Sequence, residues 1–131
     1  MSKSKLPEKP LTEVELEVMN AIWRLGECTI KEVQAELARE RELAYTTVAT
    51  VMKVLEQKHV IASRKKERVH DYRPLVAKAD YEKLSLQHLA NNLFDGSPGS
   101  MIMRLLGDER LAPEELKKIR ASLAERLGDK S

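Results

Sequence analysis

The residues best suited to chemistry in this chain lie on one face of a predicted helix, residues 45–58. Apolar residues in this segment repeat at i, i+3, i+4 and i+7, which is the pattern of a helix that buries one side. They are Val48, Val51, Met52 and Leu55. The opposite side carries short hydroxyls and one lysine, which can reach base edges and phosphates in a DNA groove. The pattern therefore predicts a helix that reads DNA, and its candidate contacts are Tyr45, Thr46, Thr47, Thr50 and Lys53.

The positive charge of the chain is concentrated around this helix. The formal net charge is only +2, but residues 43–76 hold seven basic and three acidic side chains, whereas residues 8–42 hold five basic and nine acidic ones. Residues 77–131 are balanced, with nine of each. A local basic patch is the electrostatic footprint of a DNA-binding module. Three cations that follow the helix are therefore predicted to contact flanking phosphates: Lys65, Lys66 and Arg68.

Two further helices are expected before the DNA-reading helix. The first begins at a capping box made by Thr12 and Glu15 and ends at Gly26. The second begins at another capping box, Thr29 with Glu32, and runs to about residue 39. The second helix and the DNA-reading helix would then form a helix-turn-helix, with the DNA-reading helix as its recognition helix.

A short β-hairpin is predicted after the third helix. Residues 60–61 and 69–72 are strand-like, they flank a turn-like segment at residues 65–67, and Pro74 closes the hairpin. Three helices and a basic hairpin make a winged helix-turn-helix over residues 11–75, with the hairpin as the wing. The expected fold class is therefore mainly α with a small β-hairpin wing. Residues 1–10, rich in Lys, Ser and Pro, are expected to be a flexible tail.

Residues 76–131 are predicted to form a separate domain of three amphipathic helices. About 50 helical residues bury too little surface to be stable alone, so a second copy of the chain should supply the missing contacts. The sequence therefore predicts a homodimer. The candidate dimerisation residues are Leu86, Leu89, Leu93, Phe94, Met101, Ile102, Leu105, Leu116, Ile119 and Leu123.

Composition and spacing argue against several other classes of protein. No apolar stretch approaches the roughly 18 residues of a membrane span, and the N-terminus lacks the apolar run of a secretory signal. The single cysteine, Cys28, can form neither an internal disulfide nor a Cys-rich zinc site, and the three histidines lack metal-ligand spacing. We expect a cytoplasmic protein that is not an enzyme and carries no cofactor or metal.

Several of these motifs together resemble the penicillinase-repressor family, the BlaI/MecI/CopY type. They are Leu11-Thr12 with Glu15 and Met19, Trp23, Ala44-Tyr45-Thr46-Thr47-Val48 with Thr50 and Val51, Tyr72-Arg73-Pro74-Leu75, and Leu93-Phe94-Asp95-Gly96-Ser97. The resemblance covers residues 10–127. It implies a homodimeric repressor that binds double-stranded operator DNA through the winged helix and dimerises through three C-terminal helices. It also implies, for many members, release from DNA by cleavage in the dimerisation domain, triggered by a membrane metalloprotease sensor.

The chain departs from the family pattern at several positions. Copper-responsive members carry C-terminal cysteine pairs, which this chain lacks. Antibiotic-responsive members carry Asn-Phe at the cleaved bond, and alignment on Leu111 places Arg104-Leu105 there, which makes Arg104 and Leu105 the candidate cleavage site. His59 and Glu67 stand where the family usually has glycine.

Three hypotheses for function follow from the sequence. The leading one is a homodimeric, sequence-specific transcriptional repressor that acts on a palindromic operator. The second is a winged helix used only as a protein-interaction module, which would show no salt-dependent affinity for DNA. The excess of basic side chains over residues 43–76 argues against this hypothesis. The third is a DNA-binding regulator controlled by a small ligand between its domains, which the low aromatic content of 4% does little to support.

Overall fold

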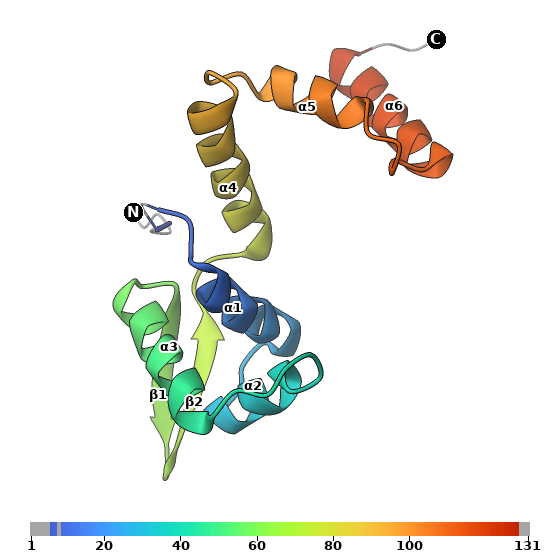
Figure 1. Ribbon diagram of the computed structural model, residues 1–131. Helices are drawn as coiled ribbons and strands as arrows, with labels where there is room; N and C mark the ends of the chain where they lie inside the picture. Colours follow the sequence, from blue (N-terminus) through green and yellow to red (C-terminus); the bar gives the residue numbers. More distant parts are fainter. Residues whose placement is uncertain (1–5, 8, 129–131) are drawn as a thin grey trace. The chain divides into compact units, whose positions relative to one another are not determined.

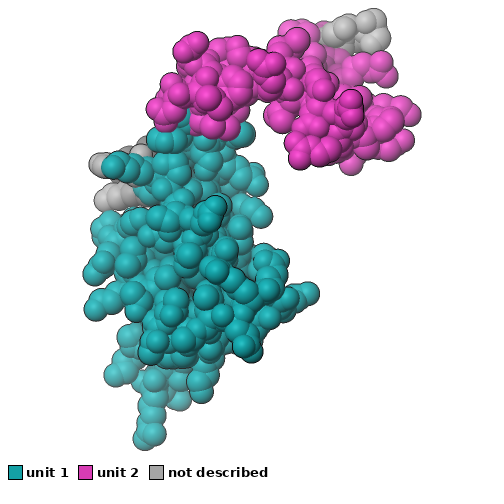
Figure 2. Space-filling view, in the orientation of Figure 1, with its two compact units in different colours: residues 1–88 teal, residues 89–131 magenta. Residues whose placement is uncertain are grey.

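The computed structural model describes residues 6–7 and 9–128 and is mainly helical (Figure 1). The predicted tail thus falls largely on residues outside this range, namely 1–5 and 8. The chain divides into two compact units, residues 1–88 and residues 89–131 (Figure 2). The division lies within the fourth helix, so the first turns of that helix belong to the same unit as the winged helix.

The first unit contains a winged helix-turn-helix, as predicted. Its helices and strands are α1 Glu13–Leu25, α2 Ile30–Leu37, α3 Tyr45–Gln57, β1 Ile61–Lys66 and β2 Val69–Pro74. The remaining described helices are α4 Lys78–Leu93, α5 Pro98–Leu106 and α6 Pro113–Leu127. The two strands pair antiparallel, and α1, α2 and α3 contact one another. The expected fold class is confirmed in this unit.

Both predicted capping boxes start their helices. At α1 the Thr12 hydroxyl accepts from the Glu15 N–H at 3.2 Å, and the Glu15 carboxylate accepts from the Thr12 N–H at 3.0 Å. The same reciprocal pair forms between Thr29 and Glu32 at α2. Each box satisfies N–H groups that the helix itself leaves without partners. Gly26 then ends α1 with φ +78°, a conformation that glycine adopts without strain.

The turn of the hairpin is displaced from its predicted place. Lys65 and Lys66 were expected in the turn, but both lie in β1, and the turn consists of Glu67 and Arg68. Glu67 has φ +58°, so the chain reverses through a positive φ without a glycine. His59, which follows α3, likewise has φ +63°. The two positions predicted to hold glycine in the family therefore keep the backbone conformation that glycine favours.

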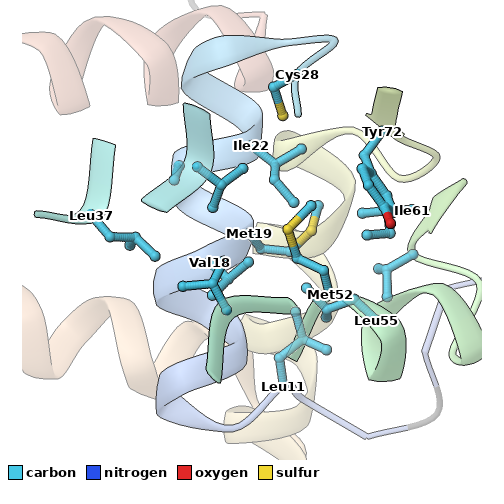
Figure 3. Close-up of a cluster of buried hydrophobic side chains, with 14 of the residues drawn as sticks. Leu11, Val18, Met19, Ile22, Cys28, Leu37, Met52, Leu55, Ile61 and Tyr72 are labelled. Atoms are coloured by element: carbon cyan, nitrogen blue, oxygen red, sulfur yellow. The ribbon is translucent and has the colours of Figure 1, made fainter. Parts of the chain in front are cut away.

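The core of the first unit holds α3 in place. Met19 and Ile22 of α1 and Met52 and Leu55 of α3 are fully buried and directed into one cluster (Figure 3). The wing is tied to the same core because Tyr72 of β2 forms an isolated antiparallel bridge with Cys28, between α1 and α2. Packing and backbone hydrogen bonds thus connect the wing, α1 and α3 into one body.

The second unit buries few of its apolar side chains. Among residues 89–128 only Ala90 and Met101 are buried, and no residue of α6 is. Met101, one of the ten predicted dimerisation residues, is 7% exposed and packs within its own chain. The other nine are exposed or partly exposed. A single copy of this unit therefore leaves a large apolar surface in water.

One ion pair joins the start of α1 to the end of α3. The Lys58 ammonium lies 2.9 and 3.0 Å from the two carboxylate oxygens of Glu15, whose side chain is 11% exposed. Burial alone would raise the pKa of Glu15, but the Thr12 N–H and Lys58 outweigh it and hold that pKa below its ordinary value. A lowered pKa means that this carboxylate stabilises the fold above its unfolded-state pKa and loses that effect as the pH falls through the folded-state value.

We predict that Glu15→Gln lowers the free energy of unfolding by about 1–2 kcal/mol at pH 7, because it removes a charge-assisted bond to a half-exposed lysine. The difference from the unaltered protein should shrink below the ordinary glutamate pKa of 4.5, where the native carboxyl also becomes protonated. Urea denaturation at fixed protein concentration measures both effects.

Glu17→Gln is the matched control for this measurement. Glu17 pairs with Arg41 at 2.8 Å, but the two side chains are 41% and 50% exposed, so the loss should be about 0.5 kcal/mol or less. Equal losses in the two variants would contradict the role assigned to Glu15.

Candidate nucleic-acid interface

Helix α3 presents its hydroxyl-bearing side to solvent. The apolar side is buried at Val48, Met52 and Leu55. The five residues predicted to read DNA are all exposed: Tyr45, Thr46, Thr47, Thr50 and Lys53. The structure thus leaves the whole predicted set available to a ligand, and the buried side fixes the direction in which the set points.

The N-terminus of α3 lacks a side-chain cap. Ala44 stands at the N-cap, and the first hydrogen bond within the helix is donated by the Val48 N–H to the Ala44 carbonyl at 3.1 Å. Helices α1 and α2 of the same domain are both capped by threonine. The first N–H groups of α3 therefore remain suited to an anion such as a phosphate, which the helix dipole also favours.

The charged side chains of the wing are divided between its two faces. Lys65 lies opposite His70, and Ser63 lies opposite Tyr72, so Lys65 and His70 share the face of the hairpin on which Tyr72 is buried. Arg64 and Lys66 lie on the other face. Successive side chains of a strand alternate between faces, so neighbouring cations of β1 are not equivalent.

Acidic partners hold some of the wing cations but not others. Arg64 pairs with Glu27 at 3.3 Å, and Lys66 pairs with Asp71 at 3.5 Å. Within the described residues, no ion pair forms at three of the predicted contacts: Lys53, Lys65 and Arg68. These three keep their positive charge available for a polyanion, whereas Lys66 is partly engaged by Asp71.

A groove lies between the start of α2, the start of α3 and the wing, with a volume of about 470 Å³. Its lining residues are Thr29, Ile30, Lys31, Tyr45, Arg68, Val69, His70 and Tyr72. The groove brings together Tyr45 and Arg68, which the sequence predicted, with Lys31 and His70, which it did not. The capping box at Thr29 marks the start of α2, so Lys31 could have been placed near a helix N-terminus, but its proximity to the wing depends on the tertiary fold.

Cys28 is a packing residue rather than a reactive thiol. Its side chain is 1% exposed, and burial, with smaller contributions from Glu32, Asp71 and Glu27, raises the pKa of the thiol to about 11. A thiol with such a pKa carries almost no thiolate near neutral pH. The cysteine therefore adds no redox chemistry to the interface.

The predicted cleavage site lies in α5. Arg104 and Leu105 are both exposed, near the C-terminal end of a nine-residue helix. Ser97 caps the start of this helix, its hydroxyl accepting from the Ser100 N–H at 3.1 Å, and Gly107 ends it.

In the described part of the chain, no helix is both long and apolar enough to cross a bilayer.

Comparison with known proteins assigns the chain to a family. The family model described as penicillinase repressor matches residues 11–125. The penicillinase repressor of Bacillus licheniformis is 28% identical over 121 residues, which cover 92% of this chain and 93% of that protein. The transcriptional regulator BlaI of Mycobacterium tuberculosis is 31% identical over 117 residues, covering 88% of this chain and 83% of the relative.

A solved structure supports the same assignment for the first unit. The DNA-binding domain of the repressor BlaI superposes with a TM-score of 0.51 at 30% identity, covering 60% of this chain and 94% of that domain. The family model spans both units, and the relatives are matched over nearly their full length. The chain therefore belongs to the penicillinase repressor family.

Proposed function

We propose that this chain is a homodimeric transcriptional repressor that binds a palindromic operator in double-stranded DNA and works in the cytoplasm. One observation carries the proposal: in a member of the penicillinase repressor family, Tyr45 at the start of the exposed side of α3 shares a groove with Arg68, a wing cation that forms no ion pair within the described residues. The expectation that the chain is not an enzyme is confirmed by its membership of a family of repressors.

Each side chain of the interface has a role that its chemistry allows. Thr50 and Lys53, on the exposed side of α3, read base edges in the major groove. Lys65 and Arg68 contact flanking phosphates. The groove residues Lys31 and His70 add contacts to the same backbone, and the uncapped start of α3 receives one phosphate.

Dimerisation makes these contacts strong enough for a repressor. Two recognition helices related by a two-fold axis reach major grooves about 34 Å, one turn, apart or at a multiple of that distance. Binding of one half-site then raises the effective concentration of the second winged helix at the other half-site. Leu89, Leu93 and Leu123, which are 44%, 65% and 56% exposed, belong to the surface that a second copy would cover.

Cutting the Arg104–Leu105 bond would separate α6 from the rest of this surface. The bond lies in a short exposed helix, which can open locally at a lower cost than unfolding of the whole chain. Removal of α6 would weaken the dimer and, with it, the mutual support of the two half-site contacts. We infer that proteolysis at this bond would release the repressor from DNA.

The first prediction from this proposal concerns base reading. Thr50→Ala should weaken binding to the operator by about 1–3 kcal/mol and leave binding to random duplex unchanged, because a base contact contributes only on the right sequence. Fluorescence anisotropy with both duplexes at the same salt concentration measures this. Ser122→Ala, which removes an exposed hydroxyl from α6, is the control. Equal weakening on both duplexes would refute a base-reading role for Thr50.

The second prediction separates the two neighbouring lysines of the wing. Lys65→Ala should reduce the salt dependence of binding by about one phosphate contact per subunit. Lys66→Ala should reduce that slope by less, since Lys66 lies on the other face and is partly engaged by Asp71. Affinities measured over a series of salt concentrations give both slopes. Identical slopes for the two variants would contradict the assignment, and no salt dependence in the unaltered protein would favour a protein-interaction module.

The third prediction concerns the dimer. Leu123→Asp should give a monomer at micromolar concentration that binds a half-site normally and the full operator far more weakly, because it places a charge on the apolar side of α6. Ala121→Asp adds the same charge on the opposite side of that helix and should remain dimeric. Sedimentation equilibrium gives the masses. A monomeric unaltered protein would refute the proposed dimer.

A further inference from the structure

Tyr81, near the start of α4, is bonded to the start of α1. Its side chain is 5% exposed, and its hydroxyl oxygen accepts a hydrogen bond from the Leu11 N–H at 2.7 Å. Leu11 immediately precedes the N-cap of α1 and is itself buried. The bond joins two residues that are 70 positions apart and satisfies a buried polar group on each side.

Trp23, near the other end of α1, is bonded to the segment that leads into α4. Its indole N–H donates to the Val76 carbonyl at 2.8 Å, and its ring lies 5.8 Å from the ring of Tyr81, centroid to centroid. In the same segment the Leu75 N–H donates to the Val60 carbonyl at 2.8 Å. The connection between β2 and α4 is therefore held by directional bonds and is not a free linker.

We propose that Tyr81 and Trp23 fix the direction in which α4 leaves the winged helix and thereby set the half-site separation that the dimer accepts. This inference rests on the proposed function as a dimeric operator-binding protein. Both residues are positioning residues, because neither lies on the exposed side of α3 or on the wing. One bond joins Tyr81, in the first turn of α4, to Leu11 just before α1, and the other joins Val76, two residues before α4, to Trp23 near the end of α1. The start of α4 is thus held at two separated points.

The length of α4 makes this direction important. Sixteen residues at about 1.5 Å per residue span about 24 Å, so a change of about 10° at the base moves the far end by about 4 Å. One base pair corresponds to about 3.4 Å along DNA and to about 35° around its axis. Loss of the two bonds would free the winged helix to tilt and to turn about the start of α4, and both movements are needed to reach half-sites one base pair nearer or farther. The measurable consequence is the selectivity of the dimer for half-site separation.

The test uses the full chain and a symmetric duplex that the unaltered protein selects from a random pool. Base pairs are added to or removed from its centre one at a time, and an isolated half-site is measured alongside. The variants are Tyr81→Phe, which keeps the ring and removes only the hydroxyl, and Trp23→Phe, which replaces the indole and its N–H donor by a smaller aromatic ring. Tyr45→Phe is the matched control, because it makes the same change on the exposed side of α3.

The unaltered protein should lose roughly 30-fold or more in affinity for a one-base-pair change, since the second half-site is no longer reached. Tyr81→Phe and Trp23→Phe should lose roughly threefold or less for the same change, with half-site affinity within about twofold of the unaltered protein. Tyr45→Phe should weaken binding by a similar factor at each half-site that is engaged and should still discriminate clearly against a one-base-pair change.

Three results would overturn the inference. They are unchanged selectivity in Tyr81→Phe and Trp23→Phe, a loss of half-site affinity equal to the loss on the full duplex, and absence of spacing selectivity in an unaltered protein that binds DNA. Failure of the unaltered protein to bind any duplex, half-site included, would instead refute the proposed function and the inference with it.

Discussion

Burial of the apolar side of α3 is the interaction on which the rest of the structure depends. Val48, Met52 and Leu55 pack against α1, and each fully buried side chain of this size contributes about 1.5–3 kcal/mol. Because the helix has only one apolar side, this packing also decides which side faces outward. The thirteen residues of α3 thus stabilise the fold with one side and present the candidate DNA contacts on the other.

In the second unit, by contrast, most apolar side chains are not buried. Its helices bury two side chains among residues 89–128 and leave exposed leucines along α4, α5 and α6. An isolated unit of this size offers little stabilisation against the entropy cost of ordering its backbone. In the proposed dimer that surface would be removed from water and two winged helices would be brought together, so the contacts that stabilise the unit would also give the two-fold symmetry of a palindrome.

Local signals in the sequence predicted the helices well and the tertiary contacts poorly. The capping boxes at Thr12 and Thr29 are complete within four residues, so the helix starts they predict are found in the structure. The turn of the wing was misplaced because Lys65 and Lys66 are polar enough for a turn, while the true turn at Glu67 lacks the expected glycine. A short wing strand can consist of charged residues because its outer end is exposed to water.

Local sequence patterns do not predict the tertiary contacts that shape the candidate site. From the sequence, Tyr81 fits the apolar side of α4, but in the structure its hydroxyl is bonded to Leu11, which lies 70 positions away. Lys31 joins the groove only because α2 and the wing pack on the same core. The ion pair of Lys66 with Asp71 likewise depends on the strand register, which does not follow when the turn is predicted at residues 65–67.

Hydroxyl-radical footprinting of the bound operator is the decisive measurement of the proposed dimer. We expect two protected segments on one face of the duplex, related by a two-fold axis, with centres about 10 base pairs or a multiple of that apart. A single asymmetric segment, or no protection of a duplex that is shown to be bound, would contradict a homodimer that reads a palindrome with two recognition helices.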